Sequence, residues 1–139
     1  MRATFYLVIL ALLVSWQTPK GDLTVQINGL KKTVGKIQIG LYNNAEKFPD
    51  TDGQFKVVFI TAISPTTSYT FHNIPFGSYA IAVYHDIDGD DEMDKNFFGV
   101  PTEAYGFSNN VKPFLSAPAF EKAMFKFEKT QTIAIELQD

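Results

Sequence analysis

Apolar and polar residues alternate along most of the chain after its first twenty positions. In the segment 22–28, Leu23, Val25 and Ile27 alternate with polar residues, and the segment 36–41 repeats this pattern. A period of two residues indicates strands with one buried face. Because turn-forming asparagine and glycine residues lie between the two segments, we expect them to pair as a hairpin.

Five more segments have the character of strands. The segment 55–63 is apolar on both faces, which indicates either a strand covered on both sides or one that carries an aromatic ligand face. Three others alternate, over residues 69–72, 125–128 and 132–137, and the last, 79–85, carries Tyr79, Ile81 and Val83 and ends at His85. A total of roughly seven strands predicts an all-β fold, namely a small antiparallel β-sandwich.

The remaining segments predict little helix and one long loop. Ser116 could cap a short helical turn that ends near Ala123, and residues 45–48 could form a second turn. Residues 86–112 show no alternation and are interrupted by glycine and proline. A loop of this length in a small domain is usually functional, so the site is expected there.

The first residues are expected to lie outside the folded domain. Arg2 precedes an unbroken apolar run over residues 5–14, which is the pattern of a secretory signal peptide. The alternative is an N-terminal core strand or a membrane anchor, although the run is shorter than the roughly 20 residues of a spanning helix. We expect a signal peptide at 1–18, a folded domain at 19–139, and a periplasmic or extracellular location without stable membrane insertion.

Composition limits the classes of function. The chain has 139 residues, of which 45% are hydrophobic and 19% charged, so one folded domain is expected. Its formal net charge of -3 argues against a nucleic-acid partner, which requires a basic surface. The absence of cysteine excludes a disulfide scaffold, a thiol nucleophile and cysteine-ligated metal sites. No Gly-x-Ser-x-Gly motif supports serine catalysis.

An acidic segment is the strongest chemical signal. Residues 86–94 contain six of the fifteen acidic residues, with Asp at the first, third, fifth and ninth places of a calcium loop. The sixth place is Asp91 instead of Gly, but Asp tolerates a left-handed backbone. The twelfth is Phe97, so a further carboxylate is needed, and Glu103 is the nearest candidate. The predicted metal ligands are Asp86, Asp88, Asp90, Glu92, through its main-chain carbonyl, and Asp94.

Other interpretations of this segment stay open at this stage. It could be a solvated acidic turn that binds no metal. Calcium is favoured over magnesium because a cage of protein oxygens suits the larger ion. Zinc bound through His85 is disfavoured, since the chain has only two histidines and no cysteine. The second histidine, His72, is expected to be exposed on a strand.

Several blocks of sequence together resemble a bacterial family known as domain of unknown function 2141 (DUF2141). The blocks are residues 75–86, the acidic segment, and residues 98–103, 105–109 and 117–123. The loop of this family usually reads His-Asp-x-Asn-Gly-Asn-Gly-x-x-Asp, whereas this chain has Asp88 and Asp90 at the two Asn places and Asp91 at the second Gly place. The resemblance covers essentially the whole chain after the predicted signal peptide. It implies an exported transthyretin-like or immunoglobulin-like β-sandwich without an established activity.

Two functions follow as hypotheses. The first is a non-enzymatic binding module, in which calcium orders the acidic loop and the adjacent side chains recognise an envelope or extracellular ligand, either a protein or a carbohydrate. Alternatively, the aromatic side chains that follow the acidic loop, Phe97, Phe98, Tyr105 and Phe107, fill the open end of the core. The second is a hydrolase of the transthyretin-like type, with His85 paired to Glu103 or Asp86. The candidate ligand-binding residues are Phe97, Phe98, Glu103, Tyr105, Phe107, Asn109 and Asn110.

Overall fold

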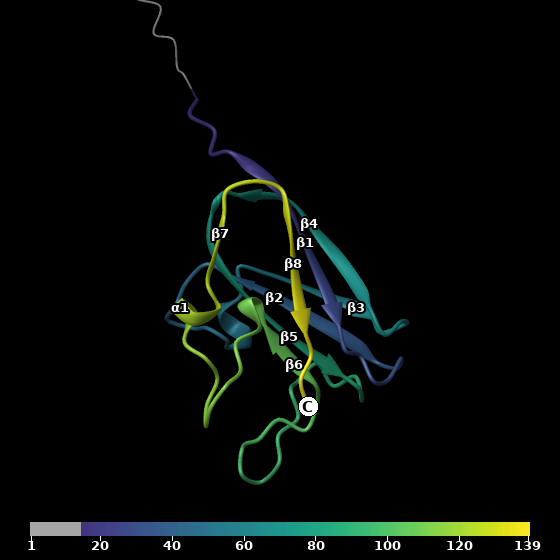
Figure 1. Cartoon of the computed structure of the whole chain (residues 1–139). Helices are drawn as coiled ribbons and strands as arrows, with labels where there is room; N and C mark the ends of the chain where they lie inside the picture. Colours follow the sequence, from purple (N-terminus) through teal and green to yellow (C-terminus); the bar gives the residue numbers. More distant parts are fainter. Residues whose placement is uncertain (1–14) are drawn as a thin grey trace, which may run out of the picture.

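The computed structural model describes residues 15–139, and they form a β-sandwich (Figure 1). One sheet has three strands in the order β4-β1-β8, and the other has the order β3-β2-β5-β6 with β7 also paired to β5. The predicted all-β sandwich is therefore confirmed. The strands are β1 (Lys20–Asn28), β2 (Lys36–Tyr42), β3 (Lys56–Thr61), β4 (Thr67–Pro75), β5 (Gly77–Asp86), β6 (Tyr105–Phe107), β7 (Phe125–Phe127) and β8 (Gln131–Glu136).

The main core lies between the two sheets. The alternating apolar residues of β1 and β2 all contribute to it and are fully buried. Burial of this apolar surface is the main force that holds the two sheets together. The six side chains are Leu23, Val25, Ile27, Ile37, Ile39 and Leu41.

A second, smaller core covers part of the outer face of the larger sheet. Tyr42 and Ala80 on this face pack with Phe107, and with Phe120 and Ala123 of the short helix α1 (Phe120–Ala123). Strand β5 is consequently buried on both faces along most of its length. This explains why residues 79–85 are apolar at nearly every position.

The expected hairpin between the first two strands is wrong. Strand β1 pairs with β4 and β8, whereas β2 pairs with β3 and β5 in the opposite sheet. The connection between them crosses from one sheet to the other, and Leu30 within it is buried in the main core. Gly29 and Gly35 both have positive φ values, +82° and +74°, which permits the two sharp changes of direction.

Two further expectations about the strands need correction. The sandwich is not wholly antiparallel, because β8 runs parallel to β1 from Leu23–Gln131 to Asn28–Glu136. The sequence also indicated seven strands, and the structure has an eighth, β6, inside the segment expected to be one long loop. Three residues are too few for an alternating pattern, so only pairing to β5 defines this strand.

Strand β3 is an edge strand and is not covered on both sides. Val58 and Ile60 pack against the main core, while Val57 and Phe59 remain 45% and 40% exposed. The first alternative for the segment 55–63 is therefore wrong. Its aromatic face stays a prediction.

Helix is scarce, as expected. The helix α1 ends at Ala123 as predicted, but it begins at Phe120, and no side chain caps it. Ser116 therefore does not act as the predicted cap. Residues 45–48 form turns and bends without helical structure. Two short 3-10 turns, η1 (Thr51–Gly53) and η2 (Ser108–Asn110), complete the described elements.

The apolar run at residues 5–14, on which the predicted signal peptide rests, lies outside the described residues. Strand β1 begins at Lys20, directly after the segment in which cleavage is expected, and Trp16 in that segment is 91% exposed. Within residues 15–139, no helix is both long enough and apolar enough to cross a membrane.

Candidate metal-binding loop and adjacent cleft

The acidic loop winds around the carboxylate of Asp86, which ends strand β5 and is fully buried. One oxygen of this carboxylate accepts a hydrogen bond from the Gly89 amide at 2.7 Å, and the other accepts one from the Asp91 amide at 3.0 Å. Burial raises the pKa of Asp86, but the hydrogen bonds from these two amides and others lower it further, so the pKa lies below the ordinary value. The buried carboxylate is thus ionised at neutral pH.

Left-handed residues allow the tight winding. Gly89 has φ +80° and Asp91 has φ +63°. The expectation that Asp91 can replace the usual glycine is confirmed. The Tyr84 hydroxyl donates a hydrogen bond to the Asp91 carbonyl at 2.7 Å, which fixes this residue to the sheet.

Glu103 joins the two ends of the loop. Its carboxylate is 4% exposed and accepts hydrogen bonds from the Ile87 amide at 2.8 Å and the Asp94 amide at 3.2 Å. Single carboxylate oxygens of Asp86, Asp88 and Glu103 lie within 4.8 Å of one another. The expected position of Glu103 beside the loop is therefore confirmed, and its role as a metal ligand stays a prediction.

A second group of carboxylates shares Asp88 with the first. Oxygens of Asp88, Asp90 and Asp94 also lie within 4.8 Å of one another. A hydrogen bond from the Asp90 amide lowers the pKa of Asp88, but burial and the charges of Asp90 and Asp94 outweigh it, so the pKa is raised. Glu92 belongs to neither group, and its contribution through the main-chain carbonyl stays a prediction.

These two groups present the chemistry that a hard divalent cation requires. Calcium takes six to eight oxygen ligands, and carboxylates can bind it while they also accept hydrogen bonds from amides. Four of the five predicted ligands, together with Glu103, are brought together by the fold. Burial raises the pKa of Asp88, and repulsion from Asp90 and Asp94 raises it further; a cation would relieve this repulsion.

A tight hairpin extends from the acidic loop and carries the predicted aromatic residues Phe97 and Phe98 at its tip. Lys95 and Pro101 form an antiparallel bridge, and the Asn96 side-chain oxygen accepts hydrogen bonds from the Phe98 and Val100 amides. The two phenylalanines are 98% and 85% exposed. Neither fills the core.

The other predicted ligand-binding residues have different surroundings. Tyr105 is half-buried, whereas Phe107 is 6% exposed within the second core. The Asn109 side-chain amide donates to the Lys122 and Met124 carbonyls, at 3.0 and 2.9 Å. Filling the core therefore describes Phe107 and, in part, Tyr105, which packs against the same core. Asn109 joins η2 to the segment around α1. The Asn110 side-chain oxygen accepts a hydrogen bond from the Glu136 amide at 2.9 Å.

A cleft of about 760 Å³ lies between this hairpin and the turn at 113–117, over the outer face of the larger sheet. Its floor includes Gln38, Tyr84 and Tyr105, and its walls include Phe98 and Leu115. Gln38 is not among the predicted site residues, because a polar residue in an alternating strand is expected to be exposed. Apolar residues on both faces of the neighbouring segment 79–85 were the available signal that this outer face is covered.

His85 has contacts that differ from those of the proposed acid–base pair. Its Nε2 atom donates to the Val34 carbonyl at 2.6 Å, and the residue is 2% exposed. Within residues 15–139, the imidazole makes no hydrogen bond to a carboxylate. His72 is exposed, as expected, and its Nδ1 atom lies 3.0 Å from the Asp22 carboxylate.

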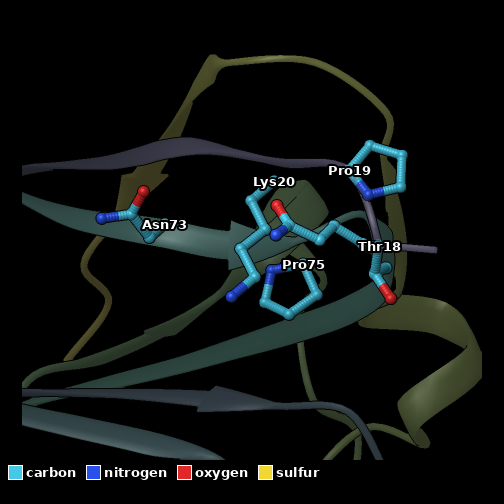
Figure 2. A pocket seen from close by; sticks show the side chains of 6 residues that line it. Thr18, Pro19, Lys20, Asn73 and Pro75 are labelled. Carbon is cyan, nitrogen blue, oxygen red and sulfur yellow. The ribbon is translucent and has the colours of Figure 1, made fainter. Parts of the chain in front are cut away.

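A second hollow, of about 830 Å³, lies at the start of β1. It is lined by residues 17–20 together with Asn73 and Pro75, and Figure 2 shows Asn73 apart from the side chains of Thr18 and Pro19. Three of these residues lie in the segment in which signal cleavage is expected. The hollow is therefore not the candidate site.

A sequence model of a known family matches residues 25–134, which include all or part of every strand and the whole acidic loop. The chain belongs to this family. It is described as "Uncharacterized protein conserved in bacteria (DUF2141)", and the resemblance noted from the sequence is thereby confirmed. Neither a curated protein nor a solved structure matches this DUF2141 chain.

Proposed function

We propose that this DUF2141 protein is an exported, non-enzymatic binding module whose acidic loop binds calcium. The observation that carries the proposal is the convergence of Asp86, Asp88 and Glu103, with oxygens within 4.8 Å, on a loop whose backbone is already wound around a buried carboxylate. Such preorganisation lowers the entropic cost of assembling a ligand set. The export component rests on the signal-like run at 5–14, and the transthyretin-like type of sandwich rests on the family resemblance.

Calcium in this loop would also stabilise the aromatic hairpin. Asp94 is the last residue of the acidic segment, and its carbonyl accepts a hydrogen bond from the Thr102 amide at 2.8 Å, across the base of the hairpin. Its amide in turn donates to Glu103. An ion held by either carboxylate group, through Glu103 in one or Asp94 in the other, would therefore fix the base of the hairpin that presents Phe98.

The contacts of His85 favour a binding module over a hydrolase. A general base needs a nitrogen that a substrate can reach, and this imidazole is buried and donates to a main-chain carbonyl. The nearby carboxylates of Asp86 and Glu103 accept hydrogen bonds from main-chain amides instead. No recognisable nucleophile accompanies them in the sequence.

Isothermal titration with calcium, combined with backbone NMR, tests the proposal. We expect saturable binding with a Kd of about 10⁻⁴ to 10⁻³ M, the range of extracellular calcium modules, and chemical-shift changes concentrated in residues 86–103. Asp88→Ala should abolish the binding, and Glu46→Gln, in an exposed turn remote from the loop, should leave it unchanged. Absence of heat and of shifts at about 10 mM calcium would reject the calcium site.

A further inference from the structure

The cleft beside the acidic loop has a floor built by one row of residues that crosses four strands. Phe59, Gln38, Tyr84 and Tyr105 are successive cross-strand partners on β3, β2, β5 and β6. Residues in register lie side by side on one face of a sheet, so this row is continuous. The last three line the cleft, whose volume of about 760 Å³ is within the usual range of ligand sites.

Gln38 is the unusual member of this row. It is 6% exposed and it lines the cleft, although a polar residue in an alternating strand is expected to face solvent. Within residues 15–139, the one fully buried side-chain polar atom without a partner is Nε2 of Gln54, so the Gln38 amide is not sealed off and can pair with a group that enters the cleft. A glutamine amide offers both a donor and an acceptor, which matches the main-chain group of a peptide.

The walls of the cleft are apolar and exposed. Phe98 on the hairpin is 85% exposed, and Leu115 on the opposite turn is 96% exposed. An apolar side chain placed between them would remove both from water, which is favourable in proportion to the apolar area that is covered. Leu115 also has a φ of +65°, so its turn holds it in a conformation that non-glycine residues rarely adopt.

The rim of the cleft is acidic. Asp50, Asp91 and Glu92 line it, against one basic residue, Lys95. Lys36 pairs with Asp91 at 3.3 Å in an exposed ion pair. Even when both lysines are counted, the three carboxylates outnumber them, so the rim keeps a net negative charge. The rim therefore attracts a cationic group and repels an anionic one.

We propose that this cleft binds an extended peptide segment of a partner protein. An apolar side chain of the segment lies between Phe98 and Leu115, a main-chain amide group pairs with Gln38, and a neighbouring lysine or arginine faces the acidic rim. The inference deepens the proposed binding module, on which it rests, by naming its class of ligand. A neutral glycan fits less well, because it has no cationic group to match the acidic rim.

Selection from a random heptapeptide library displayed on phage tests this proposal. The full chain is the target, in buffer with calcium, and phage that bind the Phe98→Ser/Leu115→Ser double variant are removed first. We expect enrichment of sequences with an apolar residue next to lysine or arginine. For a selected peptide, each of Phe98→Ser, Leu115→Ser and Gln38→Leu should weaken binding at least about tenfold, as loss of a central contact does.

Two neighbouring residues provide matched controls. Phe97 and Phe114 are 98% and 84% exposed, on the same hairpin and the same turn as Phe98 and Leu115, but they do not line the cleft. Phe97→Ser and Phe114→Ser should leave the peptide affinity within about twofold, because a hot spot depends on its place in the interface. An equal loss of peptide affinity in both pairs of variants would contradict the cleft, since it would indicate nonspecific apolar binding by the hairpin and the turn.

The remaining outcomes separate this inference from the calcium site. No enrichment, enrichment of acidic peptides, or Phe98-dependent binding of a neutral oligosaccharide panel in place of peptides would each overturn the peptide cleft. Calcium binding without peptide binding rejects only this inference. If the protein binds the peptide but gives no heat on titration with calcium, the cleft is supported and the metal part of the proposed function is rejected.

Discussion

The hydroxyl of Tyr84 donates a hydrogen bond to the carbonyl oxygen of Asp91 at 2.7 Å, so the floor of the cleft holds the left-handed residue of the acidic loop. Burial raises the pKa of Tyr84, and the charges of nearby carboxylates raise it further. The hydroxyl therefore remains protonated, and able to donate, well above neutral pH. Through this bond, the cleft and the acidic loop are parts of one unit.

Tyr84→Phe tests this connection. The change removes one hydrogen bond and no packing, so the free energy of unfolding should fall by about 1 kcal/mol. Amide hydrogen exchange in residues 87–94 should also become faster. Tyr105→Phe is the matched control, because Tyr105 lies in the same row and its hydroxyl makes no hydrogen bond within residues 15–139. Equal exchange in the two variants would show that the bond does not hold the loop.

Glu103→Gln should destabilise the fold even without metal. The glutamine side chain offers one acceptor where two oxygens now bind the Ile87 and Asp94 amides, so one amide loses its partner. Loss of a buried hydrogen-bond partner costs about 1 to 3 kcal/mol, which urea unfolding in chelator would measure. Glu121→Gln, on an exposed position of α1, should have little effect. A neutral result for Glu103→Gln would contradict its role as the link between the ends of the loop.

The acid limb of the stability profile should depend on Asp86 and Asp88 in opposite ways. The pKa of Asp86 is lowered in the folded state, because the amide hydrogen bonds outweigh burial, so its stabilising contribution is present above the ordinary Asp pKa and is lost as pH falls through the lower folded value. The pKa of Asp88 is raised, so its unfavourable contribution at neutral pH is relieved as pH falls.

Unfolding free energies in chelator, measured from about pH 6 down to about pH 3, check these signs. Asp86→Asn should flatten the loss of stability toward low pH, and Asp88→Asn should steepen it. Glu46→Gln, which lies outside the loop, should retain the wild-type slope. The same slope in all three variants would show that the loop carboxylates do not set the acid limb.

The local sequence pattern predicted the strands but could not predict their partners. Leu23 to Ile27 and Ile37 to Leu41 have the same alternation whether they pair together or face each other across the core, and the structure has the second arrangement. The parallel pairing of β1 with β8 depends on contacts more than a hundred residues apart. Such pairing leaves no signal in any short window of sequence.

The acidic loop was more predictable than the cleft. Ligand spacing in a calcium loop is local, so the residues from Asp86 to Asp94 could be proposed as candidate ligands from their positions alone. Glu103 could be suggested only as the nearest carboxylate, and the fold brings it to Asp86. The cleft depends on the lateral register of Gln38, Tyr84 and Tyr105, which follows from the order of strands in the sheet.

Export can be tested by the mass of the protein recovered from the host envelope. If residues 5–14 are the apolar part of a signal peptide, the recovered chain should begin between Trp16 and Lys20. Intact-mass spectrometry distinguishes these start sites. Recovery of the full-length chain from the cytosol alone would contradict the expected location.

The melting temperature with and without calcium tests the central claim most directly. A ligand that binds only the folded state stabilises it by RT ln(1 + [L]/Kd), so about 1 mM calcium should contribute about 0.4 to 1.4 kcal/mol for a Kd of about 10⁻³ to 10⁻⁴ M. In a domain of this size, the melting temperature should rise by about 1 to 7 °C. Asp88→Ala should abolish the rise, Glu46→Ala should keep it, and magnesium should give a smaller one. A wild-type melting curve that does not move in about 10 mM calcium would contradict the assignment of the acidic loop as a calcium site.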